Sequence, residues 1–456
     1  MNQITPRNRD TGADDSGRRL ESLSALSSRL LELCSKAGAD QAEVSCSEER
    51  GLNVGVRMGE VETVEATRDR GIAVTVYFGQ CKGSASTADL REDSLAATVE
   101  QACAIARFTS PDPAAGLADA ARMATHPLEL DTWHPWELDA DRAVELALAC
   151  EAAGRDADPR IANSDGASVG TGASLGVYAN SHGFVGASRD TVHSISCALI
   201  AGRGEQMQRQ GWYTAGLAAD DLEPAAAVGR KAAARTVARL DPRPLSTGRY
   251  PVLFDAPVAR TLIGHLLAAV SGGAQYRQAS FLLGAVGERL FPGWFRVRER
   301  PHLVRGLRSA WFDAEGVATR DSALVEDGVL SRYVLGSYSA RRLGLESTGN
   351  AGGVRNVEVA ANAGGQDALL RTMGTGLLVT DLMGQGVNPV TGDYSRGASG
   401  FWVEGGAIAW PVEGITIAGN LRSMFQAIEA VGSDIDPRSH LRTGSILLDG
   451  MTVAGG

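Results

Sequence analysis

The 456-residue sequence lacks several features that would assign it to a common class of protein. It has six cysteines, none of them after Cys197, and no Cys-x-x-Cys pair, which favours reduced, mostly buried thiols over a disulfide framework. No apolar run approaches the roughly 18–20 residues that span a bilayer, so no membrane partner is expected. The first ten residues also lack the apolar core of a secretory signal. These absences predict a cytoplasmic protein.

An excess of positive charge is lacking as well. The formal net charge is −10 and the pI is about 5.3, which argues against non-specific contact with a phosphate backbone. A basic stripe of Lys231, Arg235 and Arg239 falls in the C-terminal half of an expected helix, where cations suit the helix dipole. We therefore expect no nucleic-acid partner.

Familiar catalytic motifs are absent too. The sequence contains neither a Walker-type phosphate loop nor the Gly-x-Ser-x-Gly turn of serine hydrolases. Residues 170–176 are rich in glycine, but their spacing differs from that of a GxGxxG loop and no helix clearly follows. No catalytic residue is therefore assigned.

The most informative stretch that is present spans residues 384–420, where glycines separate short apolar runs. Gly405 and Gly406 between two such runs predict a tight hairpin, and the whole stretch predicts an antiparallel meander followed by a helix at 421–430. The polar loop before it is either an ordinary surface loop or a binding loop held by rigid strands. On the second interpretation, the candidate peptide-binding residues are Asn388, Asp393, Tyr394, Ser395, Trp402 and Glu404.

The remaining pattern predicts an α+β fold: an N-terminal α+β region with small antiparallel sheets, followed by a β-rich C-terminal domain with helices. We expect a mobile tail over 1–20, the N-terminal region over 21–240 with a possible subdivision near 110–140, and the C-terminal domain over 244–456. Apolar periodicity predicts helices at 20–37, 94–107, 140–153, 222–240 and 256–270, and strands at 40–49, 52–56, 71–78, 250–254 and 444–453.

Two histidine regions could serve a metal. His126 and His134 lie near four carboxylates, but each histidine precedes a proline, so no helix sets their geometry, and an acidic, solvated linker is the favoured interpretation. His265 lies alone in the expected helix at 256–270. We favour a structural histidine with an ordinary hydrogen bond there over a vestigial ligand or acid/base group.

Several short motifs occur in an order that is similar to one known family. They are Asp-Ala-Glu-Gly at 313–316, Glu-Asp-Gly-Val-Leu at 326–330, Ser-Ala-Arg-Arg at 339–342, Ser-Thr-Gly-Asn-Ala at 347–351, and the glycine-rich stretch at 384–420. Together they resemble the PmbA/TldD family, on its TldE (PmbA) side. The resemblance covers essentially the whole chain and is strongest after about residue 245.

That resemblance has a consequence for metal binding. The TldD side is similar to zinc peptidases and carries His-Glu, three residues and His on the helix that follows the first strand of the C-terminal domain. Those positions fall here on Leu262, Ile263 and Leu267, and the family's third ligand, a cysteine near the C-terminus, has no counterpart after Cys197. Because aliphatic side chains cannot bind Zn²⁺, the resemblance implies that this chain holds no metal and that zinc resides in a TldD-like partner.

The resemblance also implies a function. We expect a TldE/PmbA-like subunit of a cytosolic metallopeptidase complex that acts on unfolded peptides of the leader-peptide or antitoxin type, in which a peptide could add a strand to an edge of the meander. The alternative is a non-enzymatic peptide-binding or scaffold homodimer. Whether the chain has activity of its own stays open. The family has also been named for modulation of DNA gyrase, for which the acidic charge gives no support through direct DNA contact.

Overall fold

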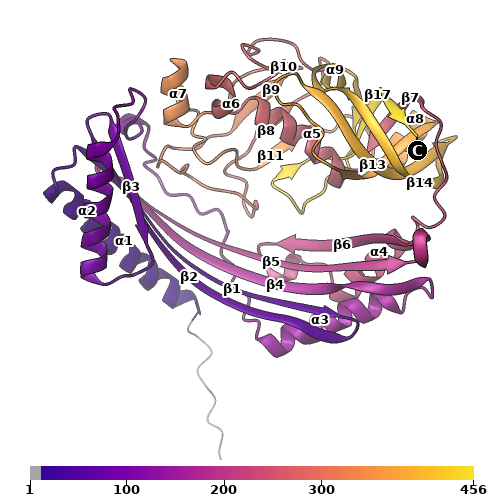
Figure 1. The fold of residues 1–456 in the computed structure, drawn as a ribbon, viewed down its shortest axis with the longest axis horizontal. Coiled ribbons are helices and arrows are strands. Elements are labelled where there is room, and N and C mark those ends of the chain that lie inside the picture. The colour runs from indigo at the N-terminus through magenta and orange to yellow at the C-terminus, as the bar shows by residue number, and fades with distance from the viewer. Residues whose placement is uncertain (1–11, 456) are drawn as a thin grey trace, which may run out of the picture.

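The computed structural model describes residues 12–455 and consists of a long curved sheet facing a C-terminal β domain (Figure 1). Helix α1 begins at Gly12, so the tail expected over 1–20 is wrong for its second half, while residues 1–11 lie outside the described part of the chain. None of the described helices is long and apolar enough to cross a membrane.

The N-terminal region repeats one arrangement twice: a helix, three strands and a second helix. The first copy contains α1 (Gly12–Lys36), β1 (Gln41–Arg57), β2 (Glu60–Phe78), β3 (Cys81–Thr87) and α2 (Glu92–Phe108). The second copy contains α3 (Ala140–Arg155), β4 (Ile161–Asn180), β5 (Val185–Ala201), β6 (Gln208–Gly216) and α4 (Ala225–Val237).

The two copies share a single sheet rather than the small sheets expected. Its order is β3-β2-β1-β4-β5-β6, and the antiparallel pair β1–β4 joins the copies. Alternate residues of β1, such as Val44 and Cys46, are buried under the helices, as the period of two requires. Helices α1 and α2 pack on the first half, and α3 and α4 on the second. The hollow side of the sheet faces the C-terminal domain (Figure 1).

The C-terminal domain is built on a six-stranded sheet of order β14-β13-β12-β7-β17-β15. Its strands are β7 (Gly248–Phe254), β12 (Gly376–Met383), β13 (Asp393–Glu404), β14 (Ala407–Asn420), β15 (Ile428–Val431) and β17 (Ile446–Ala454). A smaller sheet contains β8 (Val297–Glu299), β9 (Ser322–Glu326), β10 (Val329–Leu330), β11 (Val357–Val359) and β16 (Leu441–Arg442). The helices are α5 (Ala256–Ala269), α6 (Gly272–Tyr276), α7 (Ser337–Leu343), α8 (Gln366–Met373) and α9 (Leu421–Gln426).

The glycine-rich stretch forms the predicted hairpin but only two strands of its own: the runs at 407–410 and 415–417 belong to one strand, β14, and the third strand of the meander, β12, precedes the stretch. β12, β13 and β14 are antiparallel neighbours, and Gly405 and Gly406 turn the hairpin with φ values of 58° and 79°, which cost glycine little. The helix expected at 421–430 begins as predicted but ends at Gln426, and β15 follows.

The expected free edge of the meander is closed over three residues near the end of β14. Thr416–Ala418 of β14 pair with Thr452–Ala454 of β17, so the C-terminal sheet returns on itself. Its two faces carry separate cores: α5 packs in the large cluster on one face, and α8 contributes to a smaller cluster on the other. The edge on which strand addition was expected is therefore occupied by the chain's own C-terminal strand over that stretch.

Candidate functional site

The three positions of the family's His-Glu…His motif, two for metal ligands and one for the general base, lie inside the C-terminal domain on helix α5. Leu262 and Ile263 are 1% and 2% exposed and belong to the large core cluster, and Leu267 packs against it half-buried. Hydrocarbon side chains offer no lone pair to a metal, so the donor set does not fit Zn²⁺. Among residues 12–455, no group of three or more His, Cys, Asp or Glu side chains is arranged to hold a metal ion.

The region of His126 and His134 does not form a site. His126 Nδ1 contacts the neighbouring Thr125 hydroxyl at 2.8 Å, while His134 Nε2 lies 3.1 Å from Asp131 Oδ1. Asp139 is used as the N-cap of α3, where its carboxylate accepts from Arg142 N. The polar groups of this linker are thus engaged locally, in line with the structural interpretation.

The six candidate peptide-binding residues separate into two groups. Tyr394 and Trp402 are 1% and 8% exposed and lie in the core that packs on α5, so their rings are not presented to a ligand at the surface. The other four are exposed and make local contacts. Asn388 caps its own turn, Asp393 accepts from Thr391 and Asn420, Glu404 accepts from Trp402 Nε1, and Ser395 N bonds to Gly386 O. The meander loop thus stabilises itself without gathering these six side chains.

His265 departs from expectation. The sequence favours an ordinary hydrogen bond, yet its Nε2 is buried and has no partner among the described residues. Burial lowers the pKa of the imidazole, and the nearby Arg396 lowers it further, so the ring is neutral at physiological pH. An unsatisfied buried nitrogen in an otherwise well-paired chain requires an explanation.

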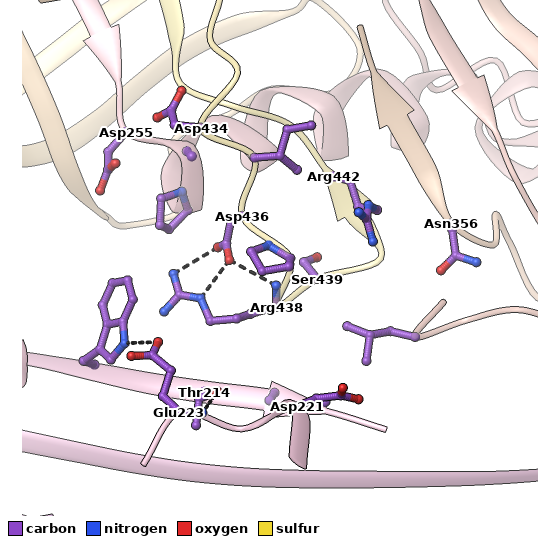
Figure 2. A pocket seen from close by; sticks show the side chains of 18 of the residues that line it. Thr214, Asp221, Glu223, Asp255, Asn356, Asp434, Asp436, Arg438, Ser439 and Arg442 are labelled. Carbon is purple, nitrogen blue, oxygen red and sulfur yellow. Dashed lines mark hydrogen bonds and ion pairs between the residues drawn. The ribbon is translucent and has the colours of Figure 1, made fainter. Parts of the chain in front are cut away.

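The main candidate site is instead a cavity of about 610 Å³ between the two parts of the chain (Figure 2). The end of β6 forms its floor, while the start of α5 and the segment 434–442 form the opposite wall. A second cavity of about 660 Å³ lies along residues 209–213 of the same strand. This second cavity extends from β6 across the face of the sheet to β5, β4 and β1, so the two cavities together border β6 on the side of the C-terminal domain.

Arg438 connects the two walls of this site. Its guanidinium lies 3.8 Å from the Trp212 ring centroid and 4.5 Å from that of Tyr213, and Nη1 donates to Tyr213 O at 3.0 Å. Nε and Nη2 bind both oxygens of Asp436 at 2.7 and 3.1 Å (Figure 2). A planar guanidinium can make all these contacts at once because its faces stack while its edge donates.

The remaining charges are arranged around the same tryptophan. Lys231 and Arg235 also lie near the Trp212 ring, at 5.1 and 5.2 Å, while Glu223 accepts from its Nε1 at 2.9 Å. Asp255, at the start of α5, is 8% exposed, and burial raises its pKa although Arg235 opposes the shift from 3.8 Å. The wall is therefore polar and charged, with an aromatic centre.

β6 is the element that gives this cavity its chemical character. Among the described residues it pairs with β5 alone, so no strand covers its other edge, although two backbone groups on that edge bond to side chains. Gly211 N bonds to the Gln210 side chain and Tyr213 O to Arg438, which identifies odd-numbered residues as facing outward. An open edge beside a cavity can accept an extended chain through main-chain hydrogen bonds. Sequence reasoning missed this site because Arg438 and Tyr213 are 225 residues apart.

The comparisons with known proteins agree with the fold and the resemblance. Three segments match the families described as PmbA/TldA metallopeptidase domain 1 (residues 42–106), central domain (133–240) and C-terminal domain (247–455). The chain is 49% identical to the metalloprotease PmbA homolog of Haemophilus influenzae, covering 93% of this chain and 94% of that protein. It is 47% identical to the metalloprotease PmbA of Escherichia coli O157:H7, covering 94% and 95%. The chain therefore belongs to the PmbA/TldD metallopeptidase family.

Solved structures share the complete architecture. A Bacteroides thetaiotaomicron protein named as a candidate modulator of DNA gyrase has a TM-score of 0.91 at 26% identity, covering 96% of this chain and 99% of that one. TldE from Thermococcus kodakarensis has a TM-score of 0.83 at 22% identity, covering 94% and 100%, which supports the fold alone. The two-part arrangement around β6 thus belongs to a recurrent fold.

Proposed function

We propose that this chain is a peptide-handling subunit of a cytoplasmic PmbA/TldD-type metallopeptidase, and that a TldD-like paralogue supplies the zinc. The substrate would be an unfolded peptide, such as a leader peptide or an antitoxin. The observation that carries the proposal is a contrast within the chain: the positions expected for metal ligands are packed aliphatic residues, while an open strand edge lies beside two cavities.

The open edge suits such a substrate for a physical reason. Strand addition reads the backbone of the incoming peptide, which every sequence carries, and it requires that the peptide be extended rather than folded. The aromatic and charged side chains around Arg438 would add contacts to side chains of the peptide without fixing its sequence. We place capture of the peptide backbone at β6 rather than at the edge of β14, part of which is paired with β17.

The role of the chain's own residues in the reaction is accordingly one of binding and orientation. A zinc-bound water in the partner would supply the hydrolytic chemistry. In this chain, outward backbone groups of β6, such as those of Gly211 and Ala215, would hold the substrate in an extended form. An oriented, extended chain presents its peptide bonds to a catalytic group at a high effective concentration.

The second candidate function is a homodimer that binds peptides or acts as a scaffold without taking part in hydrolysis. The same aliphatic residues on α5 favour it. The net charge of −10 gives no support for a DNA-binding role, although relatives carry a gyrase-related name.

The deciding experiment measures zinc content and cleavage of an unfolded peptide for the purified chain, for a TldD-like paralogue, and for their mixture. We expect no stoichiometric zinc in this chain, and cleavage only when the paralogue is present. Stoichiometric zinc in the lone chain would contradict the proposal. Failure of the two chains to associate, together with peptide binding by this chain alone, would favour the homodimer.

A further inference from the structure

Arg396 occupies a core-facing position of strand β13. Tyr394 and Ala398, two residues away on either side, belong to the core cluster under α5, and Ile417 lies directly opposite on β14 in the same cluster. Because side chains alternate along a strand, Arg396 points to the same apolar face. A charged side chain at such a position is unusual, since transfer of a charge from water to an apolar environment is costly unless it is paired.

The guanidinium of Arg396 has no such partner among the described residues. Its Nε is buried and makes no hydrogen bond, and no carboxylate between residues 12 and 455 forms an ion pair with it. The arginines Arg422 and Arg296 of the same domain, in contrast, pair with Glu288 and Asp327. A positive charge that has no carboxylate partner in the described chain, with its Nε buried, therefore lies between α5 and β13.

Two further polar groups beside Arg396 are also unsatisfied. The rings of His265 and Tyr394 are in edge-to-face contact at 5.9 Å, and His265 Nε2 has no hydrogen-bond partner in the described chain. The Tyr394 hydroxyl interacts with the side chain of Arg396 but donates to no acceptor in the described chain. Tyr394 is 1% exposed. Burial raises the pKa of its hydroxyl to about 12, with Arg396 opposing the shift, so the hydroxyl keeps its proton and can donate.

We propose that Arg396, Tyr394 and His265 form a niche that binds a carboxylate group. The Arg396 Nε–H and the Tyr394 hydroxyl would donate to the carboxylate oxygens, and His265 would donate from Nε2 in the corresponding tautomer. A water molecule could satisfy the hydroxyl and the imidazole, but only an anion also balances the charge of Arg396. A planar guanidinium matches a carboxylate in shape as well as charge.

The position of the niche indicates how a carboxylate would enter. Val387 and Tyr394 form an isolated antiparallel bridge, and Ser395 N donates to Gly386 O at 2.6 Å, so the glycine-rich loop borders β13 at this point. Arg396 and His265 are only half-buried, which leaves a route from solvent. We assign the carboxylate to a peptide, either at its C-terminus or on an acidic side chain; this choice of molecule rests on the proposed function.

The niche itself can be tested with formate as the probe. Thermal unfolding of the full chain is compared in sodium formate and sodium chloride at equal ionic strength. We expect formate to raise the unfolding temperature of the wild type and to have no such effect on Arg396→Met. In chloride, Arg396→Met should unfold at a temperature no lower than the wild type, because an apolar side chain replaces an unpaired charge.

Two variants make this test specific. Arg371→Met removes an exposed arginine from α8, on the other face of the sheet, and should retain the formate effect. Tyr394→Phe keeps the ring in the core and should weaken formate binding about ten- to a hundredfold, the effect of losing one hydrogen bond to a charged group. A formate effect of equal size in Arg396→Met and wild type, or no effect in the wild type, would overturn the niche.

The source of the carboxylate is tested with one labelled, unstructured peptide in three forms: a free C-terminus, an amidated C-terminus, and an amidated form with one glutamate. We expect one carboxylate-bearing form to bind at least about tenfold more tightly than the neutral amide, and Arg396→Met to abolish the difference. Equal binding of all three would overturn the assignment to a peptide. Neither result depends on reconstituting peptidase activity with a paralogue.

Discussion

The N-terminal sheet runs open from β3 to β6, whereas the C-terminal sheet returns on itself where β14 pairs with β17. A closed sheet has few unpaired backbone groups, and its interior is filled by one large core. In an open sheet, each edge strand is either shielded from pairing with another chain or available for it. The glycine-rich stretch thus has part of its edge paired within the chain, while β6 pairs with no strand on its outer side.

The two edges of the N-terminal sheet also differ from each other. Residues 60–70 of β2 extend beyond the short strand β3 and are exposed on both faces, but they carry four carboxylates and two arginines. Charged edges discourage strand addition. β6 contains only one charged residue, Arg209, and lies beside two cavities. The physical arguments therefore favour β6 over β2 as the site of peptide capture.

The largest expected effect concerns the closed sheet. Trp402→Ala should lower the free energy of unfolding by about 4 kcal/mol, the usual cost of removing a large aromatic side chain from a core. Chemical denaturation measures this loss, with the exposed Glu404→Ala as the control that should change stability by less than about 1 kcal/mol. Loss of peptide binding in Trp402→Ala without any loss of stability would instead return the binding role to the meander.

A similar test compares the contact of Arg438 between β6 and the C-terminal domain with an ion pair on the outer surface. Arg438→Met should destabilise the chain by about 3 kcal/mol, because it leaves the buried Asp436 without its main partner. Arg422→Met removes a half-exposed ion pair with Glu288 and should cost less than about 1 kcal/mol. Equal effects in urea unfolding would show that Arg438 does not hold β6 against the C-terminal domain.

The free energy of unfolding should also depend on pH through Asp313, which lies where the C-terminal domain contacts the N-terminal region. This carboxyl is 1% exposed and accepts hydrogen bonds from Glu315 N, Val317 N and Ala351 N, in a turn that contacts Phe184 of the N-terminal region. Burial raises its pKa from 3.8 to about 6. The folded state therefore holds the proton longer than the unfolded state, and the contribution of this group falls as pH rises from about 4 through 6.

The corresponding measurement is the difference in unfolding free energy between Asp313→Asn and wild type at several pH values. The variant cannot ionise, so the difference should shift in its favour by up to about 3 kcal/mol between pH 4 and pH 7. A difference that does not vary with pH would mean that the backbone hydrogen bonds keep the Asp313 pKa near its ordinary value.

The smallest expected effect concerns the two edges of β6, one paired with β5 and the other facing outward. Ala215 belongs to the outward-facing register, so Ala215→Pro should remove a donor for an added strand and weaken peptide binding by up to about tenfold, with little change in stability. Thr214→Pro should instead break a hydrogen bond to β5 and lower the unfolding temperature. Unaltered peptide affinity in a stably folded Ala215→Pro would exclude this edge.

Local features of the chain could be predicted well from its sequence. The helices at 140–153 and 256–270 appear as α3 and α5 because their apolar spacing follows the helical period, and the Gly405-Gly406 hairpin follows from turn chemistry. The joining of β1 to β4 could not be predicted, since a period of two does not specify which strand lies alongside.

The candidate site was harder to predict for the same reason. Tyr394 was placed on a binding loop because its neighbours are polar, but β13 begins at Asp393 and its alternation turns Tyr394 into the core. The stack of Arg438 on Trp212 depends on a contact across the whole second half of the chain. The assignment of the metal-site motif to Leu262, Ile263 and Leu267 rests on the family resemblance and stays a prediction; the structure adds that Leu262 and Ile263 are buried and Leu267 is half-buried.

Peptide capture at the open edge can be tested most directly by amide hydrogen exchange of the full chain with and without an unfolded peptide. We predict slower exchange at the outward-facing amides of Gly211, Tyr213 and Ala215 when the peptide is present, and no change along β14. Protection confined to residues 407–414 of β14, with β6 unchanged, would contradict capture at the N-terminal edge and place it on the C-terminal sheet.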